Sequence, residues 1–187
     1  MIYTFHKVER EIGWNNDWIS PERFEEFIKD NKPFYSLDDY LKNGRKGNVI
    51  TFDGIYQNVY KYAFPILKRY NVPFEMFVIW DYIEEDNEFE VGEPFAKFCS
   101  YKEIWKMNEK LGGINSNSCG HYNLTKLKDD DIISETSRFM RFKYFAYPNG
   151  RFNDRIKKAV IEAGYKGAVG TNMGDDSQFE LLRKNIC

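Results

Sequence analysis

The sequence lacks an excess of charge of either sign, and it has no long apolar run. Its 187 residues include 27 Lys and Arg against 29 Asp and Glu, which leaves a net charge of −2 at pH 7. Proteins that bind nucleic acid through its phosphates carry a clear basic excess, so we expect no nucleic-acid partner. The longest apolar stretches, such as residues 63–67 and 76–80, are much shorter than the roughly 20 residues of a membrane-spanning helix. We therefore expect no membrane span.

Cysteine is scarce and irregularly spaced. The three cysteines are Cys99, Cys119 and Cys187, and an odd, unpaired set is typical of reduced thiols, not of a disulfide framework. The first residues, Met-Ile-Tyr-Thr-Phe-His, include no basic segment, apolar run or small-residue cleavage site of the kind found in a secretory leader. Both absences predict a cytoplasmic location.

Glycine-rich phosphate loops are also missing, since neither GxGxxG nor GxxxxGK occurs. Aromatic residues, in contrast, make up 18% of the chain, as 16 Phe, 13 Tyr and 4 Trp. This surplus favours a large aromatic core, with a surface that stacks on sugar-like ligands as the alternative. With 42% hydrophobic residues, no repeats and no linker, residues 1–187 are expected to form a single domain.

Strand and helix signals alternate along the whole chain. Such alternation predicts parallel strands joined by right-handed crossovers. About six strand–helix units, without a glycine-rich turn after the first strand, favour a distorted (β/α) barrel over a dinucleotide-binding fold. The acidic residues 84–93 are expected to form a solvated loop. The expected strands are 2–5, 47–52, 74–80, 113–116, 144–146 and 167–169. One expected helix begins at residue 21, and the others span 36–43, 60–67, 100–111, 128–141 and 154–163.

Polar and aromatic side chains directly follow several of these strands. In parallel barrels the functional residues lie at the carboxyl ends of the strands. Taken alone, a loop histidine is more often a hydrogen-bonding partner than a metal ligand, and an aspartate after a strand often caps a helix. Their shared position at one end of the barrel makes them candidates as a group. The residues at these positions are His6, Asp53, Asp81, His121, Tyr147 and Asn149.

Three segments of the chain resemble sequence motifs of one enzyme family. Residues 49–60, which include Thr-Phe-Asp-Gly-Ile-Tyr, resemble the first motif of polysaccharide deacetylases, the NodB-homology domain of carbohydrate esterase family 4, which normally reads Thr-Phe-Asp-Asp-Gly-Tyr. Residues 114–124 are similar to the second motif, Ile-Gly-Ser-His-x-x-x-His-x-x-Leu, and residues 145–153 to the third. The resemblance implies a deacetylase-type (NodB-like) barrel. Weaker similarities lie at residues 5–8, 65–74 and 162–166.

The resemblance also implies roles for particular positions. In the family, the first Asp of Asp-Asp is the catalytic base, while the second Asp and the two motif-two histidines hold a divalent metal such as zinc. An ungapped match places Asp53 at the base position, with Gly54 and Asn117 at two of the metal positions and only His121 retained. A gapped match would instead place Asp53 at the metal position and remove the base.

Further departures affect the third motif and the metal. Ala146 stands where the family often has Arg, Asn149 stands where it has Tyr or Trp, and no later histidine replaces the final catalytic one. Catalytic zinc normally needs three protein ligands, whereas glycine offers none and an asparagine carbonyl is a poor substitute for imidazole. We therefore expect no bound metal cofactor. Replacing Gly54 by Asp and Asn117 by His should recreate the metal site, unless Gly54 needs a positive φ.

The leading hypothesis is a divergent deacetylase-like protein of carbohydrate metabolism, impaired in metal-dependent N- or O-deacetylation, that still binds a carbohydrate or amino-sugar in the old groove. A second hypothesis is an active hydrolase of non-peptide C–N bonds that deacetylates an amino-sugar with relocated ligands: His6, Asp53, Asp81 and His121. A third is a partner-binding subunit in polysaccharide assembly. The expected groove residues are His6, Tyr56, Trp80, Asp81, His121, Tyr147 and Asn149, with Trp80 or Tyr56 as a stacking face.

Overall fold

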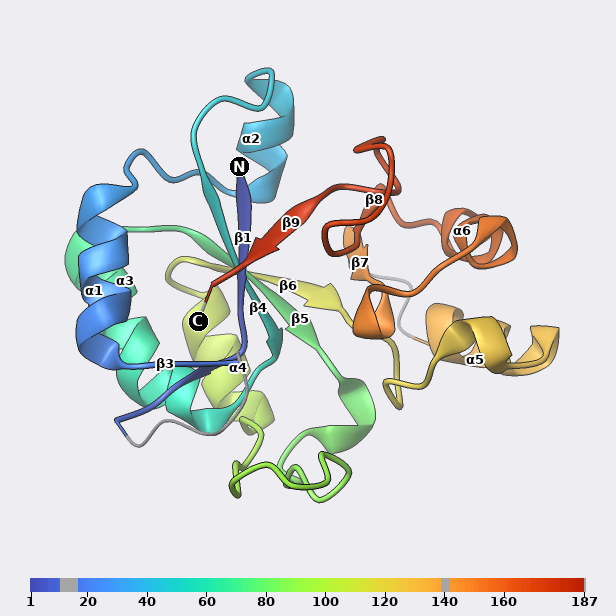
Figure 1. The fold of residues 1–187 in the computed structure, drawn as a ribbon, viewed down its shortest axis with the longest axis horizontal. Helices are drawn as coiled ribbons and strands as arrows, with labels where there is room; N and C mark the ends of the chain where they lie inside the picture. Colours follow the sequence, from blue (N-terminus) through green and yellow to red (C-terminus); the bar gives the residue numbers. More distant parts are fainter. Residues whose placement is uncertain (11–16, 139–141, 187) are drawn as a thin grey trace.

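The centre of the molecule is a curved sheet of seven parallel strands (Figure 1). The structure is a computed structural model that describes residues 1–10, 17–138 and 142–186. The strands lie in the order β8-β7-β6-β5-β4-β1-β9. Their bounds are β1 Ile2–Phe5, β4 Val49–Gly54, β5 Phe74–Val78, β6 Gly112–Ser116, β7 Tyr144–Ala146, β8 Gly167–Val169 and β9 Arg183–Asn185. Two short strands, β2 (Lys7–Val8) and β3 (Trp18–Ile19), pair separately.

The sheet closes almost completely into a barrel. The chain that leaves β8 returns so that the N–H of Leu181 donates to the carbonyl of Ala168, and the N–H of Gly170 donates to the carbonyl of Leu181, both at 3.0 Å. The next residues form β9, which pairs with β1. The two edges of the sheet are thereby brought together, which confirms the expected distorted (β/α) barrel.

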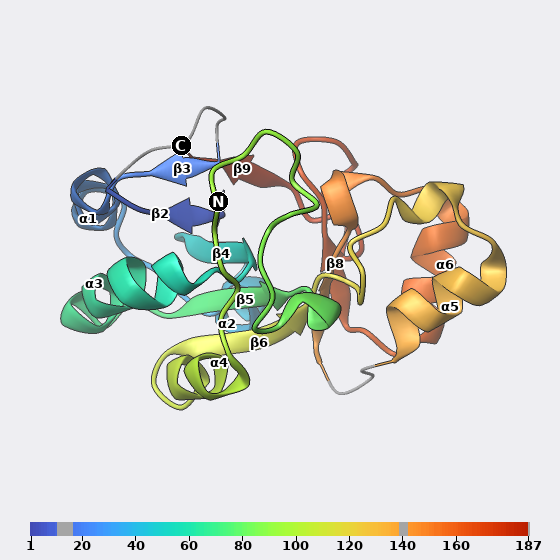
Figure 2. The ribbon, with the colours of Figure 1, turned by 90° about the horizontal axis from the view of Figure 1, so that it is seen from below.

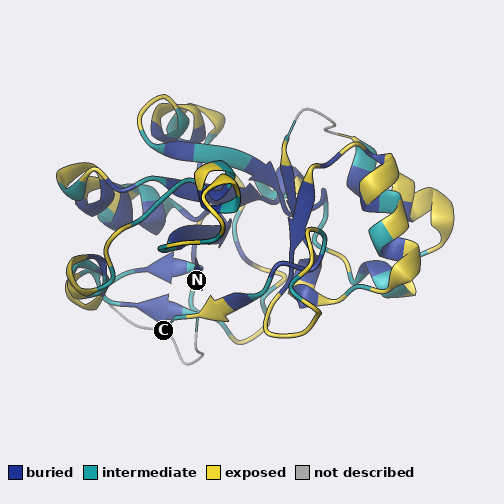
Figure 3. Ribbon diagram, turned by 90° about the horizontal axis from the view of Figure 1, so that it is seen from above, coloured by how far each residue is buried: buried dark blue, intermediate teal, exposed yellow. Residues whose placement is uncertain are grey.

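Six helices surround the strands, with their outer faces exposed and their inner faces buried (Figures 1 and 3). Three begin at serine N-caps whose hydroxyls accept backbone N–H bonds, and Ser100 with Glu103 forms a complete capping box. Among the described residues, no helix is both long and apolar enough to cross a bilayer. The helices are α1 Pro21–Asp30, α2 Leu37–Lys42, α3 Phe64–Tyr70, α4 Tyr101–Asn108, α5 Asp129–Ser137 and α6 Asp154–Glu162.

Much of the aromatic surplus lies in the core, as expected. The rings of Phe5 and Phe24 meet edge to face with centroids 5.1 Å apart, and those of Phe52 and Phe74 do so at 5.9 Å. All four side chains are buried. Such pairs link β1, β4 and β5 to α1 and fix the strand ends from which the site residues project.

The boundaries differ from the expectations at several places. The second expected strand runs two residues further, to Gly54, so that Asp53 lies inside a hydrogen-bonded strand, whereas β5 ends at Val78, two residues before the expected end. A π-helical turn, Val59–Ala63, precedes α3, in which Pro65 is the second residue. Helix α5 ends at Ser137, and residues 139–141 of the expected helix lie outside the described part of the chain.

Candidate functional site

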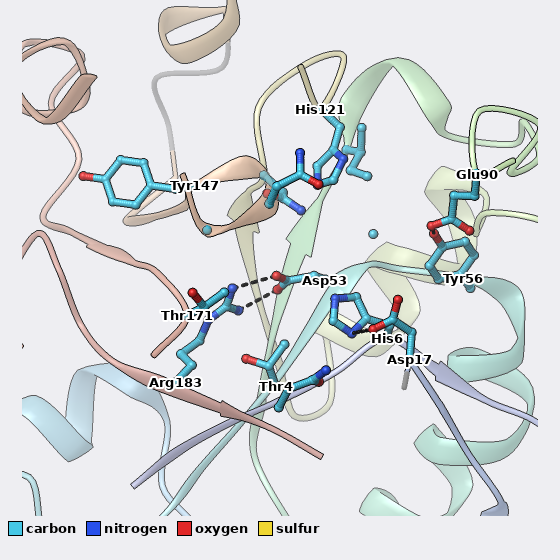
Figure 4. Close-up of a pocket in the computed structure, with 16 residues that line it drawn as sticks. Thr4, His6, Asp17, Asp53, Tyr56, Glu90, His121, Tyr147, Thr171 and Arg183 are labelled. Atoms are coloured by element: carbon cyan, nitrogen blue, oxygen red, sulfur yellow. Dashed lines mark hydrogen bonds and ion pairs between the residues drawn. The ribbon is translucent and has the colours of Figure 1, made fainter. Parts of the chain in front are cut away.

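A pocket of about 340 Å³ lies at the carboxyl ends of the barrel strands (Figure 4). It is where the sequence placed the candidate residues, because parallel strands present their carboxyl ends on one side of a barrel. Segments distant in sequence contribute to it, including the ends of β1 and β4, the loop after β6 and the start of β9. The candidates that line it are His6, Asp53, Tyr56, His121, Tyr147 and Asn149.

An ion pair between Asp53 and Arg183 forms the floor of the pocket. Two guanidinium nitrogens of Arg183, Nη1 and Nη2, each donate to one carboxylate oxygen of Asp53 at 2.7 Å. The Arg183 Nε donates to the carbonyl of Gly170, also at 2.7 Å. Only 8% of Asp53 and 4% of Arg183 are exposed. The two-point geometry and the burial make this pair the most strongly held polar contact in the pocket.

The pair sets the charge state of the pocket. Burial alone would raise the pKa of Asp53, but the adjacent Arg183 guanidinium outweighs it and holds the pKa below its ordinary value. Burial also lowers the pKa of His121 below its ordinary value of 6.5, so its imidazole is mostly neutral at pH 7. Asp53 is therefore ionised and neutralised by Arg183, next to an uncharged His121.

The loop after β6 holds His121 toward the pocket. The backbone N–H groups of Cys119 and Gly120 both donate to one oxygen of Glu135, at 3.0 and 2.9 Å. The hydroxyl of Ser118 accepts the N–H of His121 at 3.0 Å. Ser118 and His121 have positive φ values of 65° and 57°, a conformation that non-glycine residues rarely adopt. Such strain persists where surrounding contacts enforce it, and it is common at binding sites.

Asn117 presents an amide that lacks partners. The residue is 1% exposed and lines the pocket, and its backbone N–H donates to the carbonyl of Val78 at 2.8 Å. Neither its side-chain oxygen nor its side-chain nitrogen has a hydrogen-bond partner among the described residues. An unsatisfied buried polar group costs about 1–3 kcal/mol. A bound molecule that both donates and accepts would recover this free energy.

The backbone at Gly54 excludes an ordinary side chain. Gly54 has φ +84°, and a Cβ added there would lie 2.9 Å from the ring of Tyr56. That ring is fixed, because the Tyr56 hydroxyl donates to Glu90 at 2.6 Å and the ring stacks on Phe98 at 4.3 Å. The aromatic ring thus fills the space next to Gly54.

Trp80 and Asp81 were expected in the groove, but the structure places both outside the pocket. Ile79 lines the pocket, but Trp80–Tyr82 form a 3-10 helix in which neither Trp80 nor Asp81 lines it. The Trp80 ring stacks on Phe142 at 4.6 Å, so it offers no face to a ligand in the pocket. Asp81 forms an ion pair with Arg138 at 2.7 Å on the surface.

Tyr147 is among the lining residues, but its ring is not turned into the pocket. The ring stacks on Phe152 with centroids 4.6 Å apart, its hydroxyl donates to the backbone carbonyl of Phe179 at 3.0 Å, and Figure 4 shows the ring directed away from Asp53. The following turn, Pro148–Gly150, brings Asn149 to the pocket with φ 56°. Of these two residues, only Asn149 is placed to present its polar end to a ligand.

The acidic residues 84–93 form a loop that is largely exposed, as expected, but Glu90 and Glu93 turn inward. They are one arm of a hairpin over residues 84–99, in which Asp86 and Lys97 pair in antiparallel fashion. Lys7 is 1% exposed and forms an ion pair with Glu90, while Glu93 lies 3.9 Å from its ammonium group. A buried ammonium needs counter-charges, and Lys7 therefore draws these carboxylates inward. Glu90 consequently lines the pocket.

Comparison with known proteins identifies the family. The family model described as polysaccharide deacetylase matches residues 41–168, more than half of the chain. The chain belongs to the polysaccharide deacetylase family. It is 28% identical, over 98% of its length and 76% of the relative's, to the poly-beta-1,6-N-acetyl-D-glucosamine N-deacetylase of Staphylococcus aureus.

Solved structures support the fold of this polysaccharide deacetylase family member. The Streptococcus pyogenes deacetylase PplD, in complex with acetate, superposes with a TM-score of 0.82 at 20% identity, covering 99% of this chain and 91% of that one. IcaB from Ammonifex degensii superposes with a TM-score of 0.80 at 20% identity, covering 99% and 89%. The barrel is therefore of the NodB-like deacetylase type.

The residues present do not fit the divalent metal that this family implies. At the three matched metal positions, Gly54 has no side chain and Asn117 presents an amide, which leaves His121 alone. In the part of the chain that the structure describes, no three His, Cys, Asp or Glu side chains are grouped so as to hold an ion. The relocated set fails on geometry as well, because Asp81 is paired with Arg138 outside the pocket.

Arg183 is the most important of the pocket residues that sequence reasoning missed, which also include Glu90 and Thr171. It begins a three-residue strand that carries no hydrophobic alternation, and no expected element covered it. The sequence offered one hint, which is that Ala146 stands where the family often has Arg. A buried Asp53 then needs a cation from elsewhere in the chain. Arg183 provides it from the opposite edge of the sheet.

Proposed function

We propose that this polysaccharide deacetylase family member binds a carbohydrate, of the amino-sugar class, in the pocket without a metal and does not perform metal-dependent deacetylation. Family membership supports the ligand class. The buried Asn117 amide, which has no partner among the residues that the structure describes, is the observation that carries the proposal, because a lining residue with an unpaired donor and acceptor favours a ligand that supplies both.

The charge state of Asp53 argues against its acting as a base on unassisted water. Free water has a pKa of about 15.7, which a catalytic metal lowers to about 7. The pKa of Asp53 lies below its ordinary 3.8 because Arg183 outweighs the effect of burial. A carboxyl group with a lowered pKa is a weak base and remains a good hydrogen-bond acceptor.

The same groups are well arranged to bind hydroxyls. Each Asp53 oxygen accepts one bond from Arg183 and retains a further lone pair for a ligand O–H. Asn117 can accept from one hydroxyl and donate to another, and neutral His121 can do the same. Tyr56, stacked on Phe98, supplies an apolar wall. This combination of polar groups and an aromatic face matches the mixed surface of a sugar ring.

Calorimetry on an Asn117→Leu variant tests the proposal. Leucine has a similar shape without the polar atoms, so the variant should be as stable as the wild type or more stable, by up to about 1–3 kcal/mol. It should lose measurable affinity for N-acetylglucosamine and glucosamine, which the wild type binds. Asp81→Asn, outside the pocket, is the matched control and should bind as the wild type does. Unchanged sugar binding by Asn117→Leu would contradict the proposed site.

A zinc titration tests the proposal that the pocket binds no metal. We expect no stoichiometric binding of zinc, cobalt or nickel to the wild-type protein, because His121 is the only matched ligand. Elemental analysis that finds about one metal per chain, lost in the His121→Ala variant, would overturn this part. A hydrolase with another ligand set would then become the better explanation.

A further inference from the structure

A second cavity, of about 470 Å³, lies at the opposite end of the barrel from the pocket. We call it the amino-end cavity, because Glu75 near the start of β5, Gly113 near the start of β6 and Tyr144 at the start of β7 line it. Figure 1 shows α2 beside the start of β1, and in the view from below in Figure 2 α2 lies behind β5 and β6. The described residues that line this cavity and those that line the pocket do not overlap.

The sheet is split where the amino-end cavity lies. Strand β6 pairs with β5 over its whole length, but its register with β7 consists of Ser116 and Phe145 alone. At the start of β7, the backbone N–H of Tyr144 donates to the side-chain oxygen of Asn115 at 3.2 Å. A side chain thus bridges the two strands where a backbone ladder would otherwise run. The opening between β6 and β7 is therefore held apart by a specific polar contact.

The carboxylate of Glu75 is fixed against this opening. Glu75 is 6% exposed, its Oε1 accepts the backbone N–H of Leu37 at 2.8 Å, and its Oε2 accepts the Asn115 amide at 2.7 Å. A Cβ added to Gly113 would lie 2.1 Å from Oε2, so the carboxylate occupies the space that a side chain would need there. Each oxygen accepts one bond and retains a further lone pair. Glu75 therefore has acceptor capacity left for a molecule in the cavity.

Glu75 forms no ion pair with any residue that the structure describes. The ammonium of Lys143 bonds instead to Asp38, which also accepts the Tyr144 hydroxyl at 2.6 Å. Lys110 lines the cavity, but it is exposed to solvent. A buried carboxylate without a counter-charge is costly to ionise, and burial accordingly raises the pKa of Glu75 above its ordinary value of 4.5. A cation that enters the cavity would remove this cost.

We propose that the amino-end cavity binds a primary ammonium group of a small molecule, with Glu75 as its counter-ion. An ammonium donates three hydrogen bonds and accepts none, which matches the carboxylate oxygens of Glu75 and Asp38. A divalent cation fits less well, because calcium and magnesium take six or more oxygen ligands and the described residues group no three His, Cys, Asp or Glu side chains. The volume leaves room for several further atoms of the ligand. Amino-sugars with a free amine and aliphatic polyamines both carry this group.

Nuclear magnetic resonance on the isotope-labelled full chain tests the site. The probe is 1,4-diaminobutane, and 1,4-butanediol is its uncharged match. We expect the diamine to shift the signals of the Asn115 side-chain amide and the Gly113 backbone N–H in a saturable way, and the diol to leave them unchanged. Glu75→Gln should weaken diamine binding by about tenfold or more, the effect of losing a charge-assisted hydrogen bond. Asp39→Asn is the matched control, because Asp39 lies on α2 outside the cavity lining, and its binding should be unchanged.

The carboxyl carbon signal of Glu75 gives a second measurement, which needs no variant. An ammonium binds the ionised form, so the diamine should lower the pKa of Glu75, and its affinity should fall as the pH falls through that pKa. Asp38 raises and Lys143 lowers the same pKa, each by less than burial does, while Lys110 and Tyr144 are the other titratable groups at the cavity. Following the carboxyl carbon itself separates Glu75 from these neighbours.

The outcomes decide both the site and the source of its ligand. The proposal is wrong if the diamine shifts neither signal, if the diol shifts them equally, or if the pKa of Glu75 is the same with and without diamine. Equal affinity in a Glu75→Gln variant that thermal melting shows to be folded would also overturn it; if that variant does not fold, the carboxyl titration of the wild type decides. Glucosamine that shifts the same two signals at lower concentration than the diamine, while N-acetylglucosamine does not, would assign the ligand to amino-sugars. The reverse order would assign it to polyamines.

Discussion

Replacing Arg183 by methionine should destabilise the protein in a way that depends on pH. Methionine keeps an apolar stem beside the Phe77 ring, 5.4 Å from the present guanidinium, but it removes the partner of Asp53. Removing one member of a buried ion pair costs about 3–5 kcal/mol, because the other charge is left without compensation. For a chain of this size, each kcal/mol lowers Tm by about 2–4 °C. The melting temperature at neutral pH should therefore fall by about 6–20 °C.

The sign of the pH dependence follows from the pKa of Asp53. In the wild type this pKa is lowered by Arg183 against the effect of burial, so the pair stabilises the fold above the unfolded value near 3.8 and the contribution is lost as the pH falls through the folded value. In Arg183→Met, burial alone acts and raises the pKa of Asp53. The variant then loses stability as the pH rises from about 4 to this raised pKa. Its deficit relative to the wild type should therefore grow from about pH 4 upward and level off above the raised pKa.

Thermal and urea unfolding at several pH values measure this deficit. The double variant Asp53→Asn with Arg183→Met is the control, because it has no charge left to titrate at the pair. Its stability relative to the wild type should vary less with pH than that of Arg183→Met. A deficit of Arg183→Met that stays constant from about pH 4 upward would refute the reasoning, since it would mean that Asp53 finds another cation or remains solvated.

Three further predictions concern the surroundings of the pair. Lys7→Met removes the cation that pairs with the half-buried Glu90, so we expect a loss of about 1–3 kcal/mol and faster proteolysis within residues 84–99, measured by mass spectrometry of limited digests. Tyr147→Phe should cost only about 1 kcal/mol and leave sugar affinity unchanged by calorimetry, because its hydroxyl bonds to a backbone carbonyl. Gly54→Asp with Asn117→His should bind zinc in calorimetry only when Ile55→Gly is added.

The sequence could predict the residues whose position follows from strand order alone. His6, Asp53 and His121 come just after, or at the end of, parallel strands, and the barrel brings such positions together without further information. Trp80 and Asp81 were misplaced because β5 ends at Val78 and the chain then enters a 3-10 helix, Trp80–Tyr82, where the expected strand continued to residue 80. Position along the chain thus indicates the end of the barrel, but not which way each side chain points.

Ion pairs between residues far apart in the chain could not be predicted from the sequence. Arg183 pairs with Asp53 across 130 positions, and Lys7 pairs with Glu90 across 83. In the sequence, a buried lysine or arginine in a short strand looks the same as an exposed one. Its burial depends on an acidic partner that only the fold brings close. Glu90 and Glu93 were assigned to solvent for the same reason.

Compared with the family motif, this chain differs at the metal site in its backbone conformation as well as in its side chains. Where the family has Asp-Asp-Gly, this chain has Asp53, Gly54 and Ile55, and the last two both have positive φ, +84° and +55°. Glycine accepts that conformation readily, whereas a β-branched residue adopts it only at a cost of about 1–3 kcal/mol. An aspartate introduced at position 54 would meet both the strained φ and the Tyr56 ring. An aspartate at position 54 can therefore turn toward His121 only if the glycine moves one position along the chain. We accordingly expect Gly54→Asp with Asn117→His to bind no zinc, and the triple variant that also carries Ile55→Gly to bind it.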